Sequence, residues 1–182
     1  MINIKTGENL ADSISPAFKA SQYKKENLIY GNANAKHKVA IFSDPLCPFC
    51  RSFVPGAIEH MKKSPELYAL YYYHFPLSSL HPASVELTKA AIAATLQGKK
   101  DAVLELYKVE IDPNEKDVNK ILSIFNAALK TNVKASDLTS KKVMELYDYD
   151  MQLAEELMVQ GTPTLFYDGK MDKSKREYLK AN

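Results

Sequence analysis

The feature that most constrains this sequence is a pair of cysteines, Cys47 and Cys50, at the point where a strand-like segment meets a helix-like one. The preceding segment, Lys38–Ser43, is a short run of mainly β-branched and aromatic residues that ends at Asp44-Pro45, and this pattern predicts a buried strand. Residues 50–61 carry apolar side chains at helical spacing and predict a helix. A chain with this order places both thiols at the beginning of that helix.

A second strand follows the helix. Leu67–Phe75 is rich in strand-forming residues and ends at Pro76. Pro55 falls inside the predicted helix, and we expect it to kink the helix rather than end it. The strand-helix-strand order implies a parallel pair of strands, because parallel neighbours require a crossover connection of this kind.

The chain from about residue 77 to residue 158 changes character and predicts helices almost throughout. Apolar residues recur there at helical spacing, and the runs have recognisable start and stop signals. The predicted helices are one that begins at Pro82 and closes at Gly98, a short one capped by Asp101, one with a capping box formed by Asp112, Pro113 and Glu115, and one from Ser140 toward Gly161. Together they predict a packed helical subdomain.

The two ends of the chain carry weaker signals. Thr164–Tyr167 predicts a strand, which is followed by a turn and a polar segment able to form a last short helix. Three apolar residues near the N-terminus have helical spacing, namely Leu10, Ile14 and Phe18. Pro16 interrupts them, so residues 1–30 are interpreted only as an N-terminal extension.

Composition narrows the classes of partner. The chain has 182 residues, of which 46% are hydrophobic and 25% charged, as in an ordinary globular protein. Its 24 basic and 22 acidic side chains leave a net charge of +2, too small to favour nucleic acid or anionic lipid. No apolar run has the length of a membrane span or a secretory signal. We expect a soluble protein without membrane insertion, either cytoplasmic or the mature part of an exported protein whose signal peptide has been removed.

Two cysteines three positions apart suit chemistry better than cross-linking, because a disulfide stabilises most when it closes a long loop. Disulfide exchange requires a thiolate that attacks and a second thiol that resolves the mixed disulfide. Unpaired N–H groups and the helix dipole favour an anion on the first sulfur. We therefore predict Cys47 as the nucleophile and Cys50 as the resolving thiol. Pro48 at the first helical position costs no hydrogen bond.

A zinc site is the main alternative for a C-x-x-C run. Such a site needs two further ligands, but no two of the histidines have the close spacing that zinc motifs show: His37, His60, His74 and His81. The strand-to-helix context favours exchange instead. We expect neither a bound metal nor an organic cofactor.

The sequence resembles the thioredoxin superfamily and, within it, the DsbA-like branch. Phe42–Cys50 looks like the strand, acidic residue and C-P-aromatic-C site of that branch, and Pro55 is placed like the helix-kinking proline of thioredoxins. Gly161–Thr164 looks like the family's cis-proline loop. These matches run in the expected order over about residues 31–169, which is most of the chain.

This resemblance implies an α/β fold that is thioredoxin-like with an inserted all-helical subdomain. The thioredoxin-like domain is expected over residues 31–76 and 159–182, and the insertion over residues 77–158. The resemblance also implies a cis peptide bond between Thr162 and Pro163, a type of bond that is accessible at modest cost only before proline. In the family this loop binds the substrate peptide beside the reactive sulfur, and Pro48 and Phe49 are expected to contact the same substrate.

The function implied by the resemblance is that of a thiol:disulfide oxidoreductase. It would exchange disulfides with protein substrates through a mixed disulfide on Cys47, as an oxidase for exported proteins in the bacterial periplasm, with another protein as its redox partner. Two alternatives stay open. One is a disulfide isomerase or reductase, monomeric or dimeric through residues 1–30. The other is a non-enzymatic chaperone that uses the cis-proline groove and keeps the cysteines as a passive bond.

Some positions depart from the strongest oxidants of the branch. Those proteins have a histidine where this chain has Phe49, so we expect a less stabilised Cys47 thiolate and a milder oxidant. Thr162 stands where several oxidases have valine, and threonine there is typical of isomerases and of some oxidases. Asp44 is expected to turn the chain and cap the helix, with proton transfer as the alternative role.

Overall fold

The computed structural model describes residues 16–181, and its centre is a five-stranded sheet with the order β1-β3-β2-β4-β5. β2 and β3 are parallel, as the strand-helix-strand order predicted, and the other neighbouring pairs are antiparallel. The short strands β1 and β5 therefore form the two edges of the sheet. The strands are β1 (Leu28–Gly31), β2 (His37–Ser43), β3 (Tyr68–His74), β4 (Thr164–Tyr167) and β5 (Lys170–Met171).

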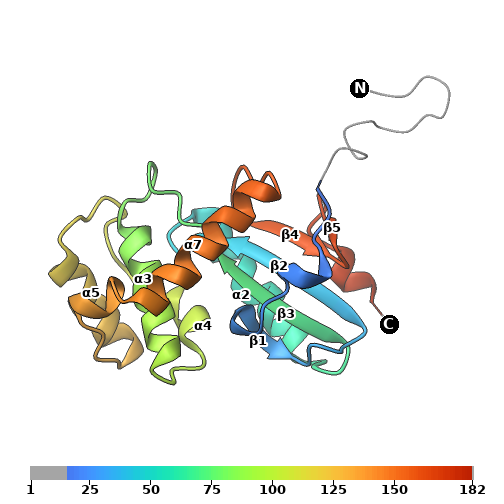
Figure 1. Cartoon of the computed structure of the whole chain (residues 1–182), viewed down its shortest axis with the longest axis horizontal. Coiled ribbons are helices and arrows are strands. Elements are labelled where there is room, and N and C mark those ends of the chain that lie inside the picture. The colour runs from blue at the N-terminus through green and yellow to red at the C-terminus, as the bar shows by residue number, and fades with distance from the viewer. Residues whose placement is uncertain (1–15, 182) are drawn as a thin grey trace.

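The central strands are buried on both faces, because successive side chains of a strand point to opposite sides. On β2, Val39 and Ile41 pack in one cluster with α2 (Pro48–Lys62). Ala40 of the same strand points the other way and packs with the C-terminal half of α7 (Lys141–Glu156). In Figure 1, α7 runs from the group of helices across to the sheet.

The remaining helices form a separate group beside the sheet (Figure 1). They share an apolar core with the first half of α7, and Leu46 from the turn before the cysteines belongs to that core. The predicted α/β fold with an inserted helical subdomain is confirmed. The helices of this group are α3 (Ala83–Leu96), α4 (Ala102–Leu106), α5 (Val118–Leu129) and α6 (Ala135–Leu138).

The predicted start of α5 was wrong. Asp112–Glu115 is a turn, and the N-cap is Asp117, whose side chain accepts hydrogen bonds from two N–H groups of the first turn at 2.9 and 3.3 Å. The carbonyl of Pro113 is engaged elsewhere, since it accepts a hydrogen bond from the N–H of Ala83 at 3.0 Å. The segment that resembled a helix start thus satisfies an unpaired N–H group at the beginning of α3.

The N-terminal part contributes a strand that the sequence analysis did not predict. β1 pairs with β3 and ends at Gly31, where φ is +79° and an added Cβ would lie 1.8 Å from the carbonyl oxygen of Tyr68. Only glycine fits that approach. Phe18 is buried against the sheet, whereas Leu10 and Ile14 of the proposed helical pattern lie outside the described residues.

A hydrogen bond from β1 also changes the expected role of Asp101. The side chain of Asp101 accepts from the hydroxyl of Tyr30 at 3.0 Å and makes no cap bond to α4, although it occupies the N-cap position. It therefore joins the edge of the sheet to the inserted helices.

A buried carboxyl group joins α7 to the sheet. Asp150 is 2% exposed, and its two oxygens accept hydrogen bonds from the backbone N–H of His74 and the side-chain amide of Asn27, both at 2.8 Å. Burial raises the pKa of Asp150 to about 7, while these two hydrogen bonds oppose the shift.

This shift predicts a pH dependence of stability. Between the ordinary pKa of 3.8 and about 7, the folded chain holds a proton on Asp150 that the unfolded chain has lost. The free energy of unfolding, relative to that of an Asp150→Asn variant, should therefore fall as pH rises through this range, by at most about 1.4 kcal/mol per pH unit. Urea unfolding at a series of pH values measures the difference.

Asp148→Asn is the control for the loss of one negative charge, because Asp148 lies on the same helix and is exposed. A difference between parent and Asp150→Asn that does not change with pH would contradict the prediction.

Candidate active site

The cysteine pair lies at the start of α2, as the sequence predicted. Cys47 is the N-cap with φ −65° and ψ 122°, Pro48 is the first helical residue, and Cys50 lies in the first turn. The helix continues through Pro55 to Lys62. Both thiols are free.

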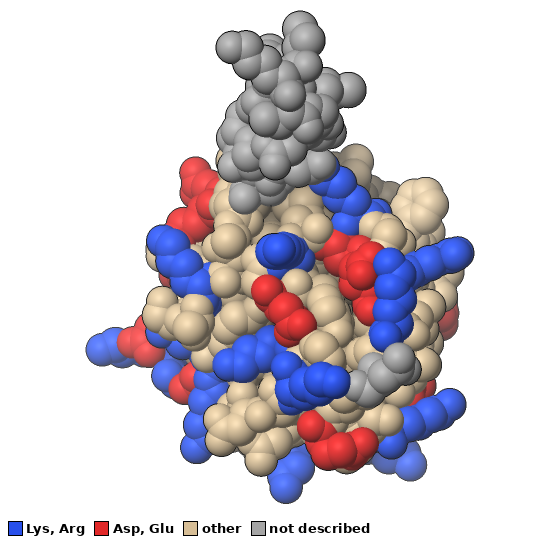
Figure 2. Space-filling model, turned by 90° about the vertical axis from the view of Figure 1, so that its right-hand side faces the viewer, with Lys and Arg blue, Asp and Glu red and all other residues tan. Residues whose placement is uncertain are grey.

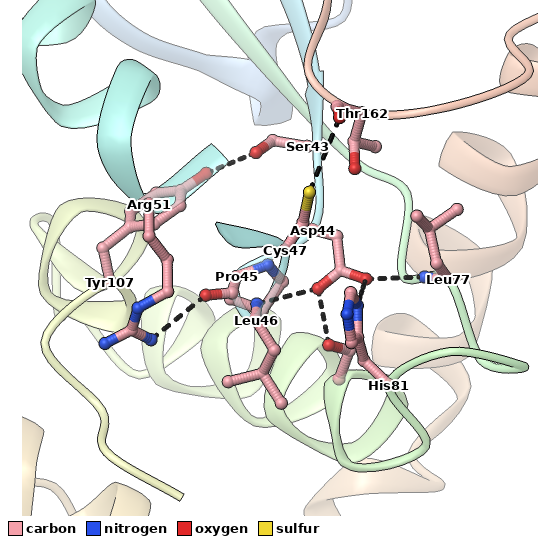
Figure 3. Close-up of polar contacts among 11 residues, drawn as sticks. Ser43, Asp44, Pro45, Leu46, Cys47, Arg51, Leu77, His81, Tyr107 and Thr162 are labelled. Carbon is pink, nitrogen blue, oxygen red and sulfur yellow. Dashed lines mark hydrogen bonds and ion pairs between the residues drawn. The ribbon is translucent and has the colours of Figure 1, made fainter. Parts of the chain in front are cut away.

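A cysteine at a helix start is expected to expose its sulfur, and the thiol one turn further on to be more enclosed. Cys50 is fully buried, in agreement with this, but Cys47 is only 5% exposed. The outermost residue of the motif is Phe49, whose side chain is 75% exposed. The loop around Thr162 lies close to Cys47, which accounts for this low exposure (Figure 3).

The cis-proline loop meets the cysteines through the sheet. β4 pairs with β2 so that Thr164 lies opposite Phe42, and this register brings the residues just before β4 to the end of β2. The Thr162–Pro163 peptide bond is cis. The Cys47 thiol donates a hydrogen bond to the carbonyl oxygen of Thr162 at 3.5 Å (Figure 3). Two segments 115 positions apart therefore share one site.

Cys50 has the environment of a thiol that is difficult to ionise. Burial is the main cause that raises its pKa to about 11, and the nearby Cys47 acts in the same direction. Hydrogen bonding from the Ser43 side chain and the backbone of Asp44 opposes this shift. At neutral pH, Cys50 is protonated, which suits a thiol that acts only after a mixed disulfide has formed.

The carboxylate of Asp44 is fully buried and completely hydrogen-bonded. One oxygen accepts from the N–H of Leu46 at 2.8 Å and from the hydroxyl of Ser84 at 2.6 Å. The other accepts from the N–H of Leu77 at 2.8 Å and lies 2.9 Å from Nδ1 of His81 (Figure 3). Asp44 turns the chain, as expected, but its side chain holds the inserted helices instead of capping α2.

Arg51 fixes the other side of the same turn. Its guanidinium donates to the carbonyl of Pro45 at 3.3 Å and to the carbonyl of Val109 at 3.0 Å, and it pairs with Glu110. The first turn of α2 is thus braced against the segment that follows α4.

Three of the four histidines contact different acidic residues and do not form a group. His81 bonds to Asp44, His37 pairs with Asp168 at 2.8 Å, and His74 is buried beside Asp150. Within residues 16–181, no three His, Cys, Asp or Glu side chains come together in a group able to hold a metal ion.

The sequence analysis missed a row of buried hydroxyl groups beside Cys50. Ser43 Oγ lies 2.6 Å from the hydroxyl of Tyr107, which in turn lies 2.8 Å from that of Tyr72. These residues come from β2, the end of α4 and β3. Tyr72 belongs to the segment Leu67–Phe75, which was predicted as a strand, and nothing in the local pattern indicated the hydroxyl partners.

Comparison with known proteins agrees with this geometry. The thioredoxin family model matches residues 23–180. The chain is 29% identical to a Na⁺/H⁺ antiporter NhaA 1 of Mycolicibacterium gilvum. The match covers 78% of this chain but only 23% of the antiporter. Within residues 16–181, no helix is long and apolar enough to cross a bilayer.

Two further relatives match over more of their own length. The chain is 28% identical to a probable disulfide bond formation protein D of Bacillus cereus, over 78% of this chain and 69% of that protein. The crystal structure of the thiol-disulfide exchange protein alpha-DsbA2 from Wolbachia pipientis superposes with a TM-score of 0.64 and 20% identity, over 90% of both chains. The chain therefore belongs to the thioredoxin family and has a DsbA-like fold, and Cys47 and Cys50 fit a C-x-x-C motif.

Proposed function

We propose that this enzyme is an oxidase that introduces disulfides into exported proteins through a mixed disulfide on Cys47. The observation that carries the proposal is the asymmetry of the two sulfurs. Cys47 lies at the helix start against the backbone of Thr162, whereas Cys50 is enclosed behind it with a raised pKa. This arrangement suits attack by a substrate thiolate on Cys47 with Cys50 as the leaving thiolate, after which a second substrate thiol displaces Cys47; it requires no cofactor.

The surroundings of Cys47 suit unfolded polypeptide as a substrate. Three large apolar side chains are well exposed in segments next to the site: Phe49 at 75%, Leu80 at 64% and Met158 at 55%. Leu80 belongs to the turn that Asp44 holds, and Met158 lies shortly before the cis-proline loop. Phe49 and Pro48, with Thr162 and Pro163, are therefore the proposed substrate contacts.

Basic and acidic side chains are interspersed on the face that Figure 2 shows. With a net charge of only +2, neither nucleic acid nor an anionic surface is a proposed partner. Proteins with thiols or disulfides are the proposed substrates, and a further protein restores the oxidised pair. The chain would act as a monomer or a homodimer.

The relative from Bacillus cereus is named for disulfide bond formation, which supports the oxidising direction. An oxidising compartment such as the bacterial periplasm would keep the Cys47–Cys50 pair oxidised. The direction is tested by incubating the oxidised protein with a reduced, unfolded model protein. Disulfides appearing in the substrate support an oxidase. Activity confined to a scrambled substrate, with a dimeric mass in solution, would instead identify an isomerase.

Replacing Cys50 tests the mixed disulfide itself. In a Cys50→Ser variant, the enzyme has no second thiol to resolve the bond between Cys47 and the substrate, so we expect a covalent complex that accumulates, survives denaturation and disappears on reduction. Non-reducing electrophoresis with an unfolded, disulfide-containing substrate detects it.

Cys47→Ser is the matched control and should trap no substrate, because Cys50 is enclosed. Peptide binding without any covalent complex in Cys50→Ser would favour a non-enzymatic chaperone.

Replacing Phe49 tests the expected redox strength. Its side chain is exposed, so substitution does not disturb the core. Phe49→His places a cation beside the Cys47 thiolate and stabilises the reduced form, and we expect the reduction potential to rise by on the order of 30 mV. Equilibration with glutathione measures the potential.

Phe49→Gln changes the same exposed position without adding charge, and its potential should stay close to that of the parent. An equal rise in both variants would show that the histidine charge is not the cause.

A further inference from the structure

The reaction depends on a Cys50 thiolate, and the structure makes that thiolate costly. Cys50 is fully buried, and burial raises the pKa of its thiol to about 11. The titratable groups around it are Cys47 from α2, Tyr72 from β3 and Tyr107 from the end of α4. The nearby carboxylate of Asp44 already accepts four hydrogen bonds. Other groups must therefore stabilise the negative charge on Cys50.

Three buried hydroxyl groups lead to the Cys50 sulfur. The hydroxyls of Tyr72 and Tyr107 are 2.8 Å apart, and that of Tyr107 is 2.6 Å from Ser43 Oγ. Cys50 packs in one buried cluster with Tyr72 and Tyr107, and hydrogen bonding from the Ser43 side chain lowers the pKa of the Cys50 thiol. Burial raises the pKa of both tyrosines, so both keep their protons and act as donors at the pH of disulfide exchange.

The direction of these hydrogen bonds follows from the number of protons, since each hydroxyl has one. The hydroxyl of Tyr107 lies between the other two, within hydrogen-bonding distance of both. When the Cys50 thiolate accepts the proton of Ser43, the proton of Tyr107 is left for Ser43 and the proton of Tyr72 for Tyr107. The opposite order turns the proton of Ser43 away from the sulfur. The favoured order directs all three donors toward the sulfur, which suits a thiolate.

We propose that the hydroxyl chain Tyr72–Tyr107–Ser43 stabilises the thiolate of Cys50 during exchange, with Tyr107 as its central positioning residue. The inference rests on the proposed exchange function. Since Tyr107 follows α4, the inserted helices then contribute to the chemistry of the pair and not to its packing alone.

The chain acts on Cys50 in both directions of the reaction. In resolution, the Cys50 thiolate attacks Sγ of Cys47, the Cys47–substrate bond breaks, and the substrate sulfur leaves as a thiolate with the electron pair. In this step the Cys50 sulfur is oxidised, the substrate sulfur is reduced, and the Cys47 sulfur exchanges one disulfide partner for another; the proton that Cys50 loses is balanced by the one that the leaving thiolate takes up. In the oxidase direction, a substrate thiolate attacks Cys47 and Cys50 leaves as the thiolate.

Tyr107→Phe tests the proposal, because it removes the central hydroxyl and keeps the ring. The mixed disulfide of Cys47 with a model peptide should be resolved about tenfold more slowly at pH 7, the change that one pKa unit makes to the thiolate fraction. The pH at which resolution reaches half its maximal rate should move upward. The first attack of Cys47 on the peptide disulfide should change far less. Rapid-mixing kinetics separates the two steps.

Tyr68→Phe is the matched control. Tyr68 lies on the same strand, is buried, and donates from its hydroxyl to the carbonyl of Tyr178 at 2.6 Å, away from the chain of hydroxyls. It should leave the resolution rate and its pH profile unchanged. Ser43→Ala removes the last link, so adding Tyr107→Phe to Ser43→Ala should cause no further slowing.

Resolution by folded Tyr107→Phe at the parent's rate and pH midpoint would overturn the proposal, and so would additive slowing in the double variant. If Tyr107→Phe folds poorly, Tyr72→Phe replaces it, because this variant removes only the terminal donor and should cause a smaller change. An unchanged pH midpoint in Tyr72→Phe would equally overturn the proposal. Failure of the exchange function itself looks different, because Cys50→Ser would then trap no substrate.

Discussion

One buried carboxyl group, that of Asp44, fixes the geometry on which the active site depends. Four donors bond to it: the backbone of Leu46 just before the cysteines, the backbone of Leu77, and the side chains of His81 and Ser84 at the start of α3. A carboxyl group is stable in a protein interior only when its oxygens are paired in this way. Moving any one of these segments would leave part of this pairing unmade, so the cysteine turn and the inserted helices keep a fixed relation.

Near Asp44, the sheet and the inserted helices each contribute side chains to the other's core. Leu46, from the turn after β2, packs in the core of the inserted helices, whereas Tyr107, from the insertion, packs beside α2 and Cys50. Arg51 bonds to the carbonyls of Pro45 and Val109 and so spans the same boundary. The reactive pair is therefore the product of both parts of the chain, and a change in the packing of the helices would reach the sulfurs directly.

The sequence predicted an element correctly where the residue pattern of that segment alone is enough to specify a strand or a helix. The strand before Cys47 and the helix after it have clear periodicity, and both were confirmed. β1 has only a few apolar residues and depends on pairing with β3, which no local pattern shows. Before α5, the predicted capping box is a turn whose Pro113 carbonyl accepts a hydrogen bond from the N–H of Ala83, a contact with a distant segment that no local pattern shows. The hydroxyl partners of Tyr107 lie 35 and 64 positions away, so they become visible only in the folded chain.

The two edge strands of the sheet, β1 and β5, are too short to bind an unfolded chain readily as an additional strand. β5 has two residues, and β1 has four, with an irregular register against β3 and an end at Gly31. Short and irregular edges offer few free backbone groups in a row, which discourages a foreign strand from extending the sheet. Under the proposed function, the enzyme would thereby avoid becoming a template for unfolded polypeptides, and contact with a substrate chain would be concentrated where Cys47 lies beside Thr162.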